Sequence, residues 1–157
     1  MFRRVISAIT ISAVGFIFPF VNFAGGEDKG LSEIPLPKKI HRVLSAEMNR
    51  IQNGMTNLAV AIPAGHWKDI IENSKKMKEG YIMKKKLSKE QMETFNNSLP
   101  PGYLELDREF QEAAGRLISA SGERDGKKVS LHFYKLTESC IKCHAKYATK
   151  RFPDLKM

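Results

Sequence analysis

Apolar residues return every three or four positions along most of the chain after residue 37, which is the spacing of an amphipathic helix. The first series begins at Lys38 and ends at Pro63 and Gly65, residue types that stop helices. A second segment begins near His66, with apolar side chains on one side and mostly lysine elsewhere. The two series are Ile40, Leu44, Met48, Ile51, Met55, Leu58 and Ile62, then Trp67, Ile70, Ile71, Met77 and Tyr81. The pattern predicts two helices.

A lysine-rich and proline-rich connection follows, from Lys84 to Pro101. Within it, Ser88 and Gln91 have the spacing of a capping box, in which each side chain bonds the other residue's backbone N–H. This predicts a short helix through Phe95, ended by the polar and proline-rich residues that follow.

Two further helices are predicted beyond this connection. The third has an inner face rich in small residues and is closed by Gly122, and the fourth has apolar positions in alternating steps of four and three. Their inner faces are Leu106, Phe110, Ala113, Ala114, Leu117 and Ala120, then Val129, Phe133, Leu136, Cys140, Cys143 and Tyr147. No strand-like alternation of useful length occurs. The predicted fold class is all-α, an antiparallel four-helix bundle.

The N-terminal segment has the order of a secretory signal peptide. Arg3 and Arg4 precede an almost uncharged apolar run over residues 5–23, and small residues follow at 24–26. The alternative is a retained membrane anchor, because the run approaches the length of a bilayer span. Pro19 and Asn22 favour cleavage. We therefore expect a signal peptide over residues 1–26, a flexible tether over 27–37 and one domain over 38–157, exported to the periplasm.

The chain is basic, with a formal net charge of +9. The predicted signal peptide contains two arginines and no acidic residue, so the exported part carries +7. A basic surface favours acidic partner proteins or anionic membranes. The expected export argues against nucleic acid, and membrane association is expected only with an uncleaved N-terminal segment. The densest basic run is either a solvated face or a docking patch for an acidic partner: Lys75, Lys76, Lys78, Lys84, Lys85, Lys86 and Lys89.

The two cysteines of the chain lie in one motif, Cys140-Ile141-Lys142-Cys143-His144. In this spacing two thiols bond the vinyl groups of haem, and the adjacent histidine becomes the proximal iron ligand. The alternatives are a structural cysteine pair, a zinc site and a thioredoxin-like dithiol. Zinc prefers four ligands, and no second Cys/His pair exists. A dithiol would normally lie near a βαβ pattern, which is absent. The motif therefore predicts one covalent haem c on the inner face of the last helix.

The chain resembles the class II cytochromes c, which include cytochrome c-prime and its low-spin, methionine-ligated relatives. The haem motif lies near the C-terminus, residues 110–117 read Phe-Gln-Glu-Ala-Ala-Gly-Arg-Leu, and Met48 lies about four turns before the turn at Gly65. The resemblance covers residues 38–152. The long lysine-rich connection and the turn at 63–65 depart from the family.

The resemblance implies that Met48 is the distal iron ligand, as in the family's low-spin members. The alternative is that Met48 only packs in the core, since methionine fills irregular gaps. Met55, on the same face, is the main rival. His41 and His66 are expected to be solvated at helix ends, and His132 lies on the haem helix itself.

The predicted function is a periplasmic electron carrier with His/Met ligation, not an enzyme, and its partners are redox proteins. The main alternative is a five-coordinate protein that binds nitric oxide or carbon monoxide. A peroxidase is disfavoured because the one acid near Met48 is Glu47, about 100° away on an ideal helix. Arg50 and Arg116 are either propionate contacts or solvated residues. Many relatives are dimers, so a homodimer stays open.

Overall fold

The computed structural model describes residues 34–155. The predicted signal peptide and residues 27–33 of the predicted tether therefore lie outside the described residues. Within 34–155 the chain is all-α, with six helices and no strand. The helices are α1 (Lys38–Ala61), α2 (Trp67–Glu79), α3 (Met83–Lys86), α4 (Lys89–Asn97), α5 (Tyr103–Gly122) and α6 (Gly126–Tyr147).

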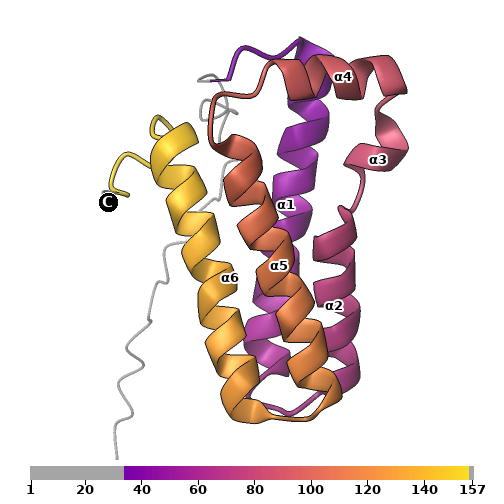
Figure 1. Cartoon of the computed structure of the whole chain (residues 1–157), viewed down its shortest axis with the longest axis vertical. Helices are drawn as coiled ribbons and strands as arrows, with labels where there is room; N and C mark the ends of the chain where they lie inside the picture. The colour runs from indigo at the N-terminus through magenta and orange to yellow at the C-terminus, as the bar shows by residue number, and fades with distance from the viewer. Residues whose placement is uncertain (1–33, 156–157) are drawn as a thin grey trace, which may run out of the picture.

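Four long helices run lengthwise and alternate in direction, and the short helices α3 and α4 cross one end (Figure 1). Helix α5 packs against both α2 and α6, and α1 packs against α2. The C-terminal end of α6 lies at the same end of the molecule as α3 and α4 (Figure 1). The motif at residues 140–144 is thereby brought to the end that the connection covers.

The buried side chains form two clusters. The larger joins the four long helices, and the smaller joins the start of α1 to α3, α4 and the segments beside them. Ile34, within the predicted tether, is also buried, with 3% of its surface exposed. The buried members of the two clusters are Leu58, Ala61, Ile70, Met77, Ala113, Ala114, Leu117, Ala120, Val129 and Leu136, then Ile40, Leu44, Leu87 and Phe95.

The helix ends follow their local sequence. Gly65 has a φ of 66° in the turn after α1, a conformation that glycine adopts without strain. The capping box of α4 is confirmed: the Gln91 N–H donates to Ser88 Oγ at 3.2 Å and the Ser88 N–H donates to Gln91 Oε1 at 3.1 Å. Asp125 caps α6 by accepting the N–H groups of Lys127 and Lys128.

Two features of α1 and its neighbours were not predicted. The connection after α2 contains a separate helical turn, α3. The buried face of α1 also includes Glu47, Gly54 and Ala61, which the apolar series left out. Gly54 lies where α1 and α2 approach closely, and a Cβ atom there would lie 2.8 Å from Met77 Cε, so the Met77 side chain would have to shift. Within residues 34–155, no helix combines the length and apolar character needed to cross a bilayer.

Candidate functional site

Cys140 and Cys143 lie on the inner face of α6, in its last two turns, and both are free thiols that are half-buried. They are three residues apart, so their side chains project from the same side of the helix. Val129, Leu136 and Tyr147 of the same stripe are buried. The structure therefore confirms that the two cysteines belong to the packed side of the last helix.

The thiols are held in their protonated form. Burial raises the pKa of both Cys140 and Cys143 to about 11, and the charges of Cys140 and Asp107 also contribute to the increase at Cys143. Disulfide oxidoreductases instead lower the pKa of the attacking cysteine, because the thiolate is the nucleophile. This environment argues against a dithiol catalyst and is compatible with cysteines used for attachment.

His144 stacks on Phe152, with 4.5 Å between the ring centroids and 13° between the ring planes. Arg151 lies 5.7 Å from the Phe152 centroid. The pKa of His144 is lowered, first by burial and then by the positive charge of Arg151. The imidazole is therefore neutral at neutral pH, which is the form that binds a metal.

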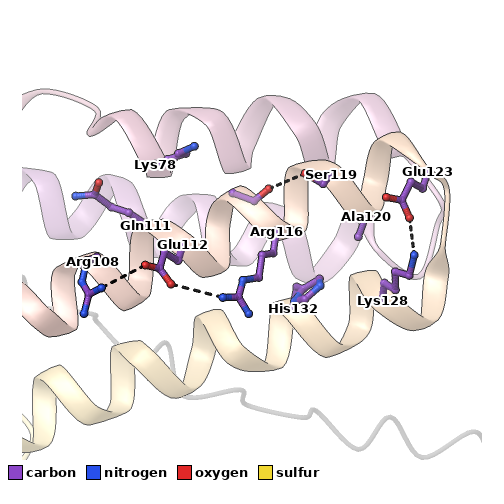
Figure 2. A pocket seen from close by; sticks show the side chains of 11 residues that line it. Lys78, Arg108, Gln111, Glu112, Arg116, Ser119, Ala120, Glu123, Lys128 and His132 are labelled. Atoms are coloured by element: carbon purple, nitrogen blue, oxygen red, sulfur yellow. Dashed lines mark hydrogen bonds and ion pairs between the residues drawn. The ribbon is translucent and has the colours of Figure 1, made fainter.

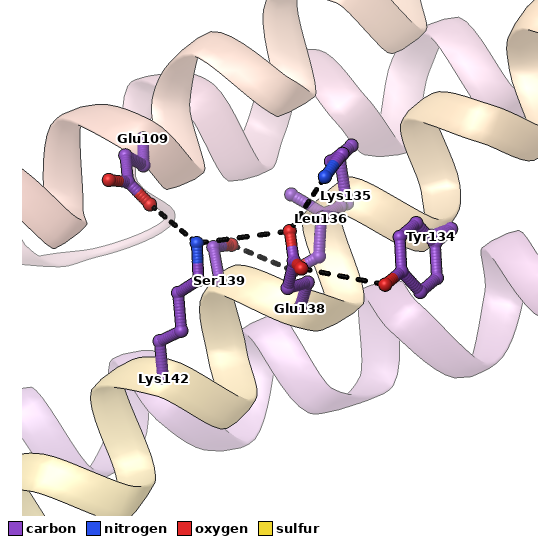
Figure 3. Close-up of polar contacts among 7 residues, drawn as sticks. All are labelled: Glu109, Tyr134, Lys135, Leu136, Glu138, Ser139 and Lys142. Carbon is purple, nitrogen blue, oxygen red and sulfur yellow. Dashed lines mark hydrogen bonds and ion pairs between the residues drawn. The ribbon is translucent and has the colours of Figure 1, made fainter. Parts of the chain in front are cut away.

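A polar network links α6 to α5 beside the motif. Lys142, which lies between the two cysteines, contacts Glu109 of α5 at 3.4 Å and Glu138 of α6 at 3.8 Å (Figure 3). Lys135 and Tyr134 also contact Glu138, at 3.0 and 3.4 Å. These partly exposed contacts join the two helices on the side of α6 that carries Lys142.

A cleft with a volume of about 180 Å³ opens between α1, the end of α2, the α3–α4 connection and α5. Its lining includes Met48 but none of Cys140, Cys143 or His144. Four of the five methionines within residues 34–155 line it, together with apolar and aromatic side chains: Met48, Met77, Met83, Met92, Leu44, Ile51, Phe95, Leu99, Tyr103, Leu104 and Phe110. Met55 packs instead against the larger core cluster.

Cys143 lies beside this cleft although it does not line it. Two lining residues, Tyr103 and Asp107, interact electrostatically with Cys143. Tyr147, one turn further along α6, donates a hydrogen bond to the Pro101 carbonyl at 2.6 Å and packs 5.5 Å from the Tyr103 ring. The motif and the methionine-lined cleft are thus tied together at one end of the molecule.

Glu47 is a residue whose role the sequence did not reveal. It is 3% exposed, and its carboxylate accepts the N–H groups of Tyr81, Ile82 and Met83 at 2.6, 2.7 and 3.1 Å. The one feature of the sequence that indicates its burial is its position three residues after Leu44, on the apolar side of α1. Its two oxygens are therefore already engaged by the backbone of the α2–α3 junction.

A second hollow, of about 550 Å³, lies over α5 and α6 and includes Lys78 from α2 (Figure 2). Glu112 contacts Arg108 at 3.7 Å and Arg116 at 3.6 Å, and Glu123 contacts Lys128 at 2.7 Å. Arg116 therefore pairs with Glu112 and does not line the cleft. The side chains in these pairs are about half exposed or more.

The other predicted candidates lie elsewhere. Arg50 is exposed on α1, and His66 precedes α2, where its exposed ring is 3.7 Å from Asp69. His132 borders the second hollow. Within residues 34–155, no group of three or more His, Cys, Asp or Glu side chains is arranged to hold a metal ion. No family model, curated protein or solved structure matches the chain.

Proposed function

We propose that the protein is an exported c-type cytochrome of class II that carries single electrons. The observation that carries the proposal is the placement of the only two cysteines of the chain. They share the inner face of the last helix, a neutral histidine follows them, and a thioether-lined cleft lies at the same end. Cys140 and Cys143 hold haem c, His144 is the proximal iron ligand, and Met48 is the distal ligand. The four long helices form the bundle around it.

The residues fit haem in their chemistry. Thioether and apolar side chains suit a flat hydrophobic group, and methionine is flexible enough to repack around it. The cleft of about 180 Å³ is smaller than the roughly 300–1,000 Å³ usual for ligand pockets. The cleft would therefore have to widen before it could hold haem.

Haem supplies an iron that alternates between the ferrous and ferric states, and His/Met ligation raises its reduction potential. The chain's own residues do the rest. Cys140 and Cys143 fix the orientation of the group, Tyr103 and Phe110 exclude water from the cleft, and the Lys142–Glu109 pair holds α6 against α5. A site held in this way changes little between oxidation states.

The test of attachment is a pyridine haemochrome assay on the full chain exported with its own N-terminal segment. We expect one covalent haem per chain, and none in the Cys140→Ala/Cys143→Ala variant. The control is Ser121→Ala, which changes a buried residue near the end of α5 and leaves the motif intact. This variant should keep the haem. A wild-type protein without covalent haem would contradict the proposal.

The second candidate function is binding of nitric oxide or carbon monoxide at a five-coordinate iron. The packing of Met48 against the smaller core cluster favours it, because a methionine that stays in the core would leave the iron without a distal protein ligand. The two functions differ in one measurable property, the spin state of the ferric protein. Electron transfer with Met48 as ligand predicts a low-spin spectrum with a methionine-to-iron charge-transfer band at the red end.

Replacing the distal methionine distinguishes the two functions. We expect Met48→Ala to lose the red-end band and to become high-spin, because the thioether ligand is gone. Met55→Ala, which changes a core methionine on the same helix, should keep the wild-type absorption spectrum. A high-spin wild-type spectrum that is unchanged in Met48→Ala would favour the gas-binding function.

A further inference from the structure

Glu47 is the one charged residue that is buried within residues 34–155. A buried carboxylate is costly unless hydrogen bonds replace its hydration. In this protein, three consecutive backbone N–H groups replace the water around the Glu47 carboxylate. The N–H groups of Tyr81, Ile82 and Met83 donate to its two oxygens. Such bonds to an ionised acceptor are stronger than those between neutral groups.

The three amides belong to the junction between α2 and α3. Gly80, with a φ of 75°, turns the chain out of α2, and Met83 is the first residue of α3. Glu47 itself precedes Met48 on α1. The carboxylate therefore bridges two segments that are 34–36 residues apart in the sequence. Each segment carries a methionine that lines the cleft, Met48 on α1 and Met83 on α3.

The junction is also packed closely against α1. A Cβ atom on Gly54 would clash with the Tyr81 side chain, and the Tyr81 hydroxyl is buried without a hydrogen-bond partner. Burial raises the pKa of Tyr81, and the nearby charge of Glu47 raises it further. The Tyr81 side chain thus adds packing at the junction but no polar bond of its own, so Glu47 supplies the polar attachment between α1 and residues 81–83.

We propose that Glu47 is a positioning residue for the iron site: it fixes Met48 and the start of α3 at the cleft and so limits the access of small ligands to bound haem. The inference rests on the proposed function. Glu47 is not itself an iron ligand and does not contact Cys140, Cys143 or His144, but it controls how small ligands reach the iron.

The test compares four variants of the full haem-loaded chain. Glu47→Gln removes the charge and leaves one acceptor oxygen, and Glu47→Asp keeps the charge but is one methylene too short to reach all three amides. Glu72→Gln makes the same charge change at an exposed residue of α2 that does not line the cleft. Val129→Ala lowers stability at the far end of α6. Two quantities are measured, amide hydrogen exchange at residues 81–83 and the rate of carbon monoxide binding to the ferrous protein.

We expect both Glu47 variants to accelerate exchange at the three amides and to speed carbon monoxide binding, each by on the order of tenfold, since both depend on local opening. Glu72→Gln and Val129→Ala should leave carbon monoxide binding unchanged. If Glu47→Gln does not accumulate, Glu47→Asp decides the question.

Faster amide exchange with unchanged carbon monoxide binding would overturn the inference, because Glu47 would then be merely structural. An equal effect of Glu72→Gln, or a wild-type rate in Glu47→Asp, would also overturn it, since charge alone would explain the result. A wild-type protein that lacks covalent haem overturns the proposed function as well. A haem-loaded protein insensitive to Glu47 overturns only the inference.

Discussion

Asp125 fixes the start of α6, the helix that carries the Cys-x-x-Cys-His motif. Its Oδ1 accepts the backbone N–H groups of Lys127 and Lys128, both at 3.1 Å. The pKa of Asp125 is lowered, chiefly by the bond from the Lys128 N–H, because that bond favours the ionised carboxylate. An N-cap of this kind satisfies amides that have no partner within the helix.

Asp125→Ala should lower the melting temperature at neutral pH. The folded-state pKa lies below the ordinary value, so the stabilisation by the charge is present above that value and is lost as the pH falls through the folded pKa. The difference in melting temperature between wild type and variant should therefore shrink in strong acid. Asp125→Asn, which caps without a charge, should show a smaller and nearly pH-independent change. Thermal melts followed by circular dichroism from neutral to strongly acidic pH measure both, and a constant Asp125→Ala difference would contradict the assignment.

Helix α4 is a short element that depends on its cap and on one buried anchor. It has nine residues, fewer than an isolated helix needs to be stable in water. The capping box at Ser88 and Gln91 satisfies two backbone N–H groups, and Phe95 joins α4 to the smaller core cluster. Met92, one turn before Phe95 on α4, lines the cleft. The integrity of α4 therefore affects one wall of the proposed haem site.

Ser88→Ala should destabilise α4 by about 1 kcal/mol, because the Gln91 N–H loses its acceptor. We expect faster amide hydrogen exchange within α4 and wild-type exchange within α6. Ser130→Ala is the matched control, since its hydroxyl bonds only the Gly126 carbonyl one turn back and caps nothing. Equal exchange of α4 in the two variants would show that the cap contributes little.

Taken as a whole, the molecule is basic, and a group of exposed lysines lies at one edge of the cleft. The chain has a net charge of +9, and Lys84, Lys85 and Lys86 are exposed on α3. The cleft lining itself is mixed in charge, with Lys78 and Lys84 beside Glu47, Glu79 and Asp107. A field of this kind accelerates the approach of anions and acidic partners more than it strengthens their binding.

Oxidation of the ferrous protein by hexacyanoferrate(III), a small anionic oxidant, should therefore slow as ionic strength rises. Charge reversal in Lys84→Glu/Lys85→Glu should lower the low-salt rate by on the order of tenfold. The double reversal Arg124→Glu/Lys127→Glu, at exposed residues around the α5–α6 turn, makes the same change in net charge and should change the rate far less. Stopped-flow measurements at several salt concentrations give the rates, and equal effects of the two variants would indicate that only net charge matters.

Apolar spacing and short motifs were enough to predict the four long helices, α4, most of the buried positions and the Cys-x-x-Cys-His run. These are local properties: apolar spacing fixes α1, α2, α5 and α6, the Ser88–Gln91 pair fixes α4, and a Cys-x-x-Cys-His run needs only five residues. Haem attachment and ligation by Met48 remain predictions from that motif and from the family resemblance.

Helix packing, in contrast, brought distant residues together. It gathered four methionines from α1, α2, α3 and α4 at one cleft, and it turned Glu47 toward three amides 34–36 residues away. No helical period encodes such contacts, because they depend on how α1 packs against the α2–α3 junction. From the sequence, an acidic residue such as Glu47 is expected to be exposed, because its burial requires hydrogen-bond donors. Those donors are backbone amides of another segment, which the sequence does not identify.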